Sequence, residues 1–273
     1  CESPPLFLGI TAVFLKRKWA CKLVFNVSDL WPESAEKMGI IKNKLILHRS
    51  YKLAKWIYKN SDFISGQTKG ILQAIEEMMP GKKLFWFPNG VDDTHFLPTI
   101  NATLNKERNS FELLYAGILG HAQGLEVILY AAKKLEKFKD IHFTIIGDGP
   151  EKENLFHLNE TLSLQNVTFI PNKPREFVLA KIENCDVYIV PLRKLDLFKG
   201  AIPSKLFEPL AFGKPILLGV DGEAKQLFIE EGKTGLFFEP GNAIELANVI
   251  LELYKNSGLK TSLGENGKAY VLK

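Results

Sequence analysis

Short apolar runs alternate with helix-like segments along the whole chain, and this alternation restricts the possible folds more than any other feature. The runs that predict strands are 21–27, 62–66, 84–87, 111–116, 141–146, 166–170, 185–190 and 216–218. Segments with helical patterning lie between most of them, among them 67–79 and 125–138. Strands that alternate with helices pair in parallel. The sequence therefore predicts an α/β protein built from doubly wound parallel sheets.

One polar stretch interrupts the alternation. Residues 98–110 are polar and carry three asparagines, so we interpret them as a linker between two domains. A chain of 273 residues is long enough for two domains of ordinary size. The sequence thus predicts a first domain over 1–97 and a second over 111–273.

The composition is ordinary for a soluble globular protein, with 46% hydrophobic and 24% charged residues. The net charge of +4 favours anionic ligands or a membrane surface, but no aromatic-basic motif indicates a nucleic-acid partner. No stretch approaches the roughly 18 apolar residues of a membrane span. Cys1, Cys21 and Cys185 show neither metal-site nor disulfide spacing, which predicts reduced thiols in a cytosolic protein.

The predicted helix over 42–59 combines six cations with large apolar residues, among them Trp56. A basic amphipathic helix of this kind can lie on an anionic membrane as a peripheral contact. The alternative is a solvated helix packed on its own sheet. The sequence leaves both interpretations open.

The stretch 196–220 carries the strongest signals for a ligand site. Ser204 stands where a helix should begin and is predicted to cap it, with Lys205 beside it and Glu208 one turn further on. A helix start, a cation and a carboxylate together suit a nucleotide diphosphate that bears a ribose. Pro209, in the second turn, breaks the usual helix rule, and such breaches cluster at functional sites. The alternative is an ordinary surface helix between a loop and a strand.

Two further candidate sites follow predicted strands, where ligands bind in open α/β sheets. The glycine-rich turn 117–124 lets backbone N–H groups approach a phosphate, although its spacing is not that of the dinucleotide fingerprint. Asp29 follows the strand 21–27 and is expected to orient a sugar hydroxyl, with Trp31 stacking on the sugar. An Asx turn beside a packed tryptophan is the alternative.

Eight segments together carry a family resemblance. In chain order they are DLWPES, PNGVD, YAGILGHAQGLE, IIGDGPEKENL, NVTFIP, VPLRKLDLFKGAIPSKLFEPLAFGKPIL, DGEAKQL and TGLFFEPGN. They resemble the family-4 glycosyltransferases of the GT-B fold, most nearly the WbuB-like L-fucosamine (N-acetyl-L-fucosamine) transferase subgroup. The resemblance runs from about Pro4 to the last residue, and each segment is weak alone.

The resemblance implies two Rossmann-like domains. The first would be the C-terminal part of an acceptor-side domain that begins about three strands before Cys1, so that this domain is truncated at its N-terminus. The second would bind a nucleotide sugar. A last helix after Tyr270 is also implied. The chain begins with Cys1 rather than methionine, so we expect a fragment, with any targeting segment outside the given sequence.

The resemblance also assigns roles to residues, with departures from the family pattern. Glu208 matches the second glutamate of the E-x7-E motif, which is expected on the donor ribose, whereas Gly200 stands where the first glutamate is usual. Ile118 and Gln123 stand where many members have an arginine and a lysine for the diphosphate. The predicted substitutes are Arg193, Lys199 and Lys205. The base ring of the donor is expected at the ends of two strands, at 147–149 and 170–172. The predicted donor-binding residues are Gly117, Gly120, Gln123, Gly147, Gly149, Pro171, Arg193, Lys199, Ser204, Lys205 and Glu208.

The implied activity is transfer of a sugar from a UDP-sugar to a lipid-linked saccharide in bacterial surface polysaccharide synthesis, with retention and without a required metal or other cofactor. Lys205, Glu208 and Asp29 are the predicted catalytic residues, and His121 is a second acceptor-side candidate. The enzyme is expected in the cytoplasm, in peripheral contact with the inner face of the plasma membrane. The alternatives are a GT-B-fold UDP-sugar epimerase and a non-catalytic nucleotide-sugar-binding subunit.

Overall fold

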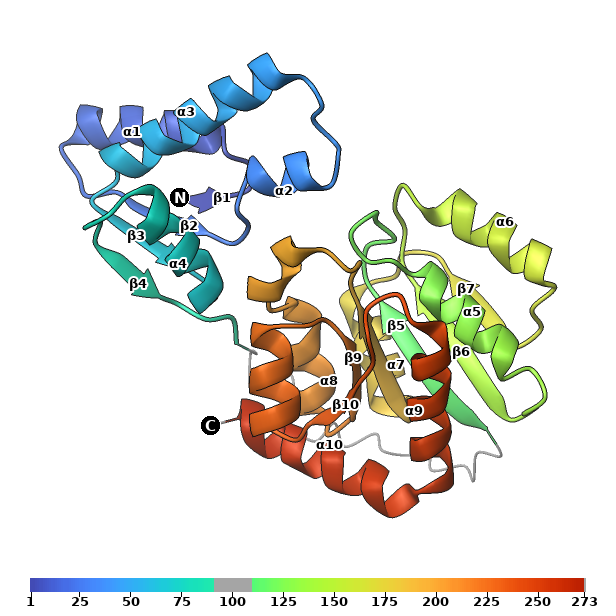
Figure 1. Cartoon of the computed structure of the whole chain (residues 1–273). Coiled ribbons are helices and arrows are strands. Elements are labelled where there is room, and N and C mark those ends of the chain that lie inside the picture. The colour runs from blue at the N-terminus through green and yellow to red at the C-terminus, as the bar shows by residue number, and fades with distance from the viewer. Residues whose placement is uncertain (91–109, 273) are drawn as a thin grey trace. The chain divides into compact units, whose positions relative to one another are not determined.

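The computed structural model describes residues 1–90 and 110–272 and divides into two compact units, each with one parallel sheet (Figure 1). Unit 1 comprises Cys1–Asn89 and Leu195–Ile202, and unit 2 comprises Gly90–Lys194 and Pro203–Lys273. The predicted α/β class with two parallel-sheet domains is confirmed. The predicted linker 98–110 lies, apart from Ser110, outside the described residues.

The sheet of unit 1 has four parallel strands in the order β1-β2-β3-β4. They are β1 (Glu2–Ser3), β2 (Val24–Val27), β3 (Phe63–Gly66) and β4 (Leu84–Trp86). The helices are α1 (Leu8–Trp19), α2 (Glu33–Lys37), α3 (Lys44–Asn60) and α4 (Lys69–Met78). Phe25, Ile57, Ile64 and Ile75 are fully buried and form the centre of the core of this unit.

Polar side chains fix where helices α3 and α4 begin. The Asn43 side chain accepts hydrogen bonds from the first-turn N–H groups of α3, and the Thr68 hydroxyl accepts one from Ile71 N in α4. These caps satisfy backbone donors that a helix start leaves unpaired. The predicted helices over 42–59 and 67–79 are therefore confirmed, and each begins two residues later than predicted.

The sheet of unit 2 has six parallel strands in the order β10-β9-β8-β5-β6-β7. They are β5 (Phe111–Ala116), β6 (Ile141–Ile146), β7 (Val167–Ile170), β8 (Val187–Pro191), β9 (Ile216–Gly219) and β10 (Gly235–Phe237). The chain builds β5 to β7 in one direction and then returns to place β8 to β10 on the other side of β5. The order therefore reverses between β5 and β8.

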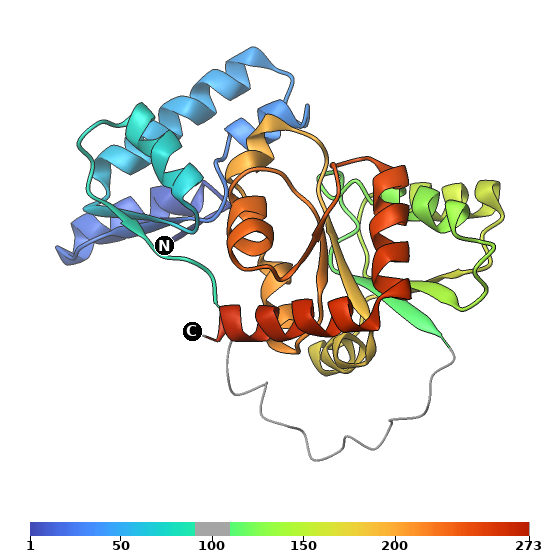
Figure 2. The same ribbon diagram turned by 60° about the horizontal axis from the view of Figure 1, so that its bottom comes forward.

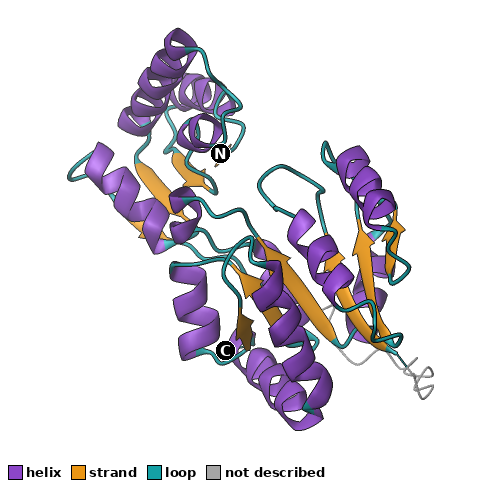
Figure 3. Cartoon of the chain, turned by 45° about the vertical axis from the view of Figure 1, so that its right-hand side comes forward, coloured by secondary structure: helices purple, strands orange, loops and turns teal. Residues whose placement is uncertain are grey.

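Helices lie on both faces of this sheet (Figure 3). They are α5 (Glu126–Lys134), α6 (Lys152–Leu162), α7 (Arg175–Asn184), α8 (Phe207–Ala211), α9 (Ala243–Lys255) and α10 (Ser257–Val271). Helix α10 lies against α8 (Figure 2). Because helices cover both faces, the central strands are apolar throughout rather than alternating.

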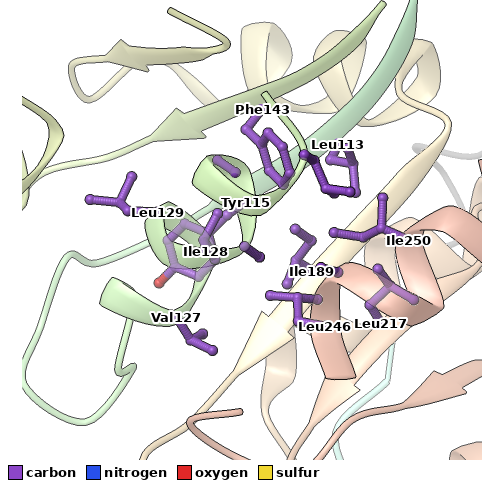
Figure 4. Close-up of a cluster of buried hydrophobic side chains, with 14 of the residues drawn as sticks. Leu113, Tyr115, Val127, Ile128, Leu129, Phe143, Ile189, Leu217, Leu246 and Ile250 are labelled. Atoms are coloured by element: carbon purple, nitrogen blue, oxygen red, sulfur yellow. The ribbon is translucent and has the colours of Figure 1, made fainter. Parts of the chain in front are cut away.

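Helices α5 and α9 pack against one another and against the sheet through a continuous apolar core. Leu246 and Ile250 of α9 lie against Ile189 and Leu217 of the sheet, and all four side chains are at most 1% exposed (Figure 4). Burial of each such side chain contributes about 1.5–3 kcal/mol to folding. This core fixes the strand ends that carry the candidate site.

Some elements differ from the prediction. The strand predicted over 21–27 begins only at Val24, and the helix predicted to run from Leu125 to Phe138 ends at Lys134. Helices α2, α7 and α10 were not predicted. None of the three cysteines, all of them among the described residues, forms a disulfide. Among the described residues, no helix is long and apolar enough to cross a membrane.

Candidate functional site

The candidate site lies where the strand order of unit 2 reverses. Open α/β sheets bind ligands outside the carboxyl ends of their strands at such a point. Gly117 directly follows β5, and Arg193 lies two residues after the end of β8. The site therefore begins with two residues that the sequence analysis selected.

The turn 117–124 is held to the turn after β6 by backbone hydrogen bonds. Leu119 N donates to Asp148 O at 2.8 Å, and Glu151 N donates to Leu119 O at 2.9 Å. A Cβ atom on Gly147, whose φ is +148°, would lie 1.9 Å from Gly117 O. Only glycine fits there, because the two turns approach one another backbone to backbone.

Lys205 lies against the first of these turns. Its Nζ donates to the Tyr115 hydroxyl at 2.9 Å and lies 4.6 Å from the centroid of the same ring. A Cβ atom on Gly117 would be 2.8 Å from this Nζ, so the cation is next to the turn backbone. Burial lowers the pKa of Lys205 to about 8. The structure therefore brings Lys205 and Gly117 together, as predicted for a phosphate site.

The Tyr115 hydroxyl links the Lys205 ammonium to the backbone of the turn. It donates to Ile118 O at 2.7 Å while accepting from Lys205, so both its donor and its acceptor function are used. Burial raises the pKa of Tyr115 well above its usual range, so the hydroxyl stays protonated. The residue pattern predicts only a strand for Tyr115, because nothing in that pattern indicates its lysine partner.

Arg193 and Gln123 lie beside the same turn. Arg193 N donates to Ala122 O at 2.9 Å, and the Arg193 guanidinium lies 3.6 Å from a carboxylate oxygen of Glu126. Gln123 Oε1 lies only 2.7 Å from the position of a Cβ atom on Gly120, so its side chain folds back over the turn. The structure thus gathers these predicted donor-site residues around one loop.

Glu208 is paired with a residue that sequence analysis missed. Arg175, the first residue of α7, donates from Nε and from a terminal nitrogen to Glu208 Oε1 at 3.2 and 2.9 Å. Both side chains remain partly exposed. Helix α7 was not predicted, so its first residue was not considered. The Lys173-Pro174-Arg175 run before an apolar segment was the available signal.

The predicted role of Ser204 as a helix cap is wrong. The element begins as a 3-10 turn over Ser204–Leu206 and becomes α-helical only in α8, and the cap residue is Pro203, without a side-chain hydrogen bond. Pro209 has no N–H, so it cannot bond to the Lys205 carbonyl as a regular α-helix requires. Ser204 still begins the element that carries Lys205 and Glu208.

A pocket of about 260 Å³ opens beside the ends of β6 and β7. Gly147, Pro171, Phe156 and Phe169 are among its lining residues, and the two aromatic rings lie 4.6 Å apart. Gly149 follows in the adjoining turn, where its N–H donates to the Asp148 carboxylate at 2.8 Å. The pocket therefore adjoins the two strand ends at which a base ring was expected.

The remaining predicted residues lie elsewhere. Lys199 belongs to unit 1, in a 3-10 turn where it pairs with Asp196 at 2.8 Å. Asp29 also belongs to unit 1, where Ser34 donates to it at 2.8 Å. Burial raises the pKa of Asp29, and the Ser34 hydrogen bond opposes that rise.

His121 lies in unit 2 and is paired with Glu151. Trp31 packs edge to face against Phe7.

No group of three or more metal-ligating side chains is found in the part of the chain that the structure describes. The site instead presents a half-buried lysine, a second cation at Arg193, a glycine-rich turn, a paired carboxylate and an apolar pocket. Cations and backbone N–H groups bind phosphates, and a carboxylate binds sugar hydroxyls. The arrangement thus suits a nucleotide with a diphosphate and a ribose.

One protein family matches this chain over most of its second half and beyond. The model of the family described as Glycosyl transferases group 1 matches residues 98–270, which is more than half of the chain. The chain belongs to the group 1 glycosyl transferases. The predicted family of glycosyltransferases is therefore confirmed at this level.

Curated relatives of this group 1 glycosyl transferase carry related names. An uncharacterized glycosyltransferase of Methanocaldococcus jannaschii is 27% identical over 232 residues, covering 84% of this chain and 61% of the relative. The putative colanic acid biosynthesis glycosyl transferase WcaI of Escherichia coli is 28% identical over 221 residues, covering 77% and 54%. The chain thus spans less than two thirds of the length of these relatives.

Solved structures share the fold at low sequence identity. Sucrose-phosphate synthase from Thermosynechococcus elongatus superimposes with a TM-score of 0.78 and 19% identity, covering 98% of this chain and 67% of that chain. Anabaena HepE in complex with UDP-glucose gives 0.78 and 16%, covering 99% and 72%. The predicted GT-B fold is confirmed.

Proposed function

We propose that the protein transfers a sugar from a UDP-sugar to a lipid-linked saccharide in bacterial surface polysaccharide synthesis, with retention of configuration. The observation that carries the proposal is the half-buried Lys205 ammonium, held by Tyr115 against the turn at Gly117. A half-buried cation beside a glycine-rich turn at a strand-order reversal is an arrangement for binding a phosphate.

The donor would bind across unit 2. Lys205, with Arg193 and the N–H groups of the turn, would neutralise the diphosphate, and the apolar pocket beside Gly147 and Pro171 would take the base ring. Glu208 would accept hydrogen bonds from the ribose hydroxyls. Each group lies on a strand end or on the helix that follows, so a rigid sheet sets their spacing.

The chemical step would break the bond between the sugar and the diphosphate. Charge develops on the departing phosphate oxygen, and Lys205 lies where it would stabilise that charge. The new bond forms between the sugar and an acceptor hydroxyl, whose proton would pass to the leaving phosphate. No side-chain base is required for this step, and we propose that no metal is required.

The names of relatives and neighbours support a UDP-sugar and a polysaccharide product. The HepE structures hold UDP and UDP-glucose, and the name of WcaI places that protein in colanic acid biosynthesis. N-acetyl-L-fucosamine is the sugar that we propose, on the resemblance of the eight sequence segments to the fucosamine transferase subgroup.

Unit 1 would provide the acceptor side and the membrane contact. Helix α3 has no acidic residue and exposes Leu45, Ile46 and Trp56 among its cations. Basic side chains near an anionic bilayer contribute about 1 kcal/mol each to binding. We propose that α3 lies on the cytoplasmic face of the membrane and that Asp29 orients the acceptor.

The test is an assay of UDP release from UDP-N-acetyl-L-fucosamine and other UDP-sugars, with and without a lipid-linked saccharide. Acceptor-dependent release together with a glycosylated lipid is the expected result. Conversion of the donor to a free sugar or an epimer without acceptor would instead indicate the epimerase alternative. Donor binding without turnover under every condition would indicate a nucleotide-sugar-binding subunit.

A further inference from the structure

We propose that Arg175 is a positioning residue that holds Glu208 so that one carboxylate oxygen faces the donor ribose. The inference rests on the proposed function, in which Glu208 binds that ribose. Arg175 donates from both Nε and a terminal nitrogen, and both bonds end on the same atom, Oε1 of Glu208, at 3.2 and 2.9 Å. The pairing therefore occupies one oxygen of the carboxylate and not the other.

Among the residues that the structure describes, none donates a hydrogen bond to the second oxygen of this carboxylate, Oε2. An ionised carboxylate oxygen accepts two hydrogen bonds, and the adjacent 2′ and 3′ hydroxyls of a ribose donate two. A single open oxygen with a fixed direction is thus suited to a vicinal diol.

Arg175 lies where its positive charge is unfavourable unless an anion is close by. It is the first residue of α7, directly after Pro174, where the positive end of the helix dipole disfavours a cation. Glu208 supplies that contact from α8, and α7 packs against α8. The pair therefore ties the start of one helix to the short element that also carries Lys205.

We expect the pair to fix the orientation of the Glu208 carboxylate rather than to add stability. The side chains are 49% and 31% exposed, and ion pairs at such exposure add little to folding stability. A planar guanidinium that donates twice nevertheless fixes the direction of the carboxylate plane. Lys205 and Glu208 are three residues apart, so fixing Glu208 also sets its distance from the proposed phosphate contact.

The test is calorimetric titration of UDP and of 2′,3′-dideoxy-UDP into the wild-type chain and five variants. Arg175→Ala should weaken UDP binding roughly tenfold, the size expected for one lost charge-assisted contact, and leave the affinity for the dideoxy analogue unchanged. Arg175→Lys should give an intermediate loss, because an ammonium cannot fix the carboxylate plane. In a Glu208→Gln background, Arg175→Ala should add little.

Lys181→Ala is the matched control, since it removes a cation from the last turn of the same helix. It should leave both affinities unchanged. Equal losses for UDP and the dideoxy analogue in Arg175→Ala, or no loss for either, would overturn the inference. If Arg175→Ala does not fold, the Arg175→Lys titrations decide by the same comparison. Failure of the wild-type chain to bind UDP would instead contradict the proposed function itself.

Discussion

Lys205 Nζ and the Tyr115 hydroxyl lie 2.9 Å apart, although their residues are 90 positions apart in the chain. The contact joins the end of β5 to the element that precedes β9 and places a cation under the turn at Gly117. It connects the fold to the proposed chemistry, because the sheet sets the position of Tyr115 and Tyr115 sets that of Lys205.

UDP affinity should fall as pH rises through about 8. Burial lowers the pKa of Lys205 to about 8, so the ligand-free protein loses this charge above that pH. The affinity loss should approach tenfold per pH unit, and titrations between pH 7 and 9 measure it. Lys205→Arg should bind UDP with little pH dependence over this range, because arginine stays protonated. A wild-type affinity that stays constant over the range would contradict the assignment.

Whereas UDP affinity should fall as pH rises, the lowered pKa of Lys205 should make the ligand-free protein more stable as pH rises. Between about pH 8 and the usual lysine value of 10.5, the unfolded chain keeps the Lys205 proton and the folded chain does not. The contribution of Lys205 to the free energy of unfolding therefore rises with pH over this interval. Denaturant unfolding of wild type and of Lys205→Met at pH 8 and 10 isolates that contribution. A difference between the two proteins that does not change with pH would refute this prediction.

Tyr115→Phe should weaken UDP binding several-fold. The ring and the cation-π contact remain, but Lys205 loses its acceptor and the Ile118 carbonyl loses its donor. Each lost hydrogen bond costs about 1 kcal/mol. Tyr188→Phe is the control, because this second buried tyrosine bonds to the backbone of Ala116 and not to Lys205. It should lower the melting temperature without a comparable change in UDP affinity; equal binding losses in the two variants would argue against the role of Tyr115.

Gly200→Glu, which restores the missing first glutamate of the family motif, should lower stability and should not tighten binding of a UDP-sugar. A Cβ atom at this position would lie 3.1 Å from the backbone Cα of Gly70, and the Gly200 carbonyl accepts a 2.6 Å bond from Thr68. Gly200→Ala should already cost about 1 kcal/mol or more by overpacking. Thermal unfolding and donor titration measure both effects. A tighter donor affinity in a protein of unchanged stability would contradict this account.

Much of the fold follows from residue patterns. The strands at 111–116 and 141–146 have the predicted bounds, because apolar runs between turn residues are an unambiguous signal. Helix α7 was missed because Pro174 and the weakly patterned residues after it resemble a loop. The prediction that Ser204 caps a helix was wrong, because Pro203 is the cap residue and the element begins as a 3-10 turn. A serine ahead of a helical segment is a strong signal for a cap, but it is only a local one.

The candidate site was predictable only in part. Lys205, Glu208 and Gly117 were selected because they belong to short segments with a local pattern. Arg175 and Tyr115 were not selected, because each acts through a partner that only the tertiary fold brings near. Contacts between residues 33 or 90 positions apart have no signature in the order of amino acids.

The most direct test of the account is calorimetric titration of UDP into the wild-type chain, Lys205→Ala and Lys133→Ala. Lys133 is a suitable control because it lies on α5 and pairs with Glu136, just beyond the end of that helix. The account predicts that wild type and Lys133→Ala bind UDP with the same affinity and that Lys205→Ala, while still folded, binds at least about tenfold more weakly. UDP binding by Lys205→Ala that equals wild type, or no binding by a folded wild-type chain, would contradict it.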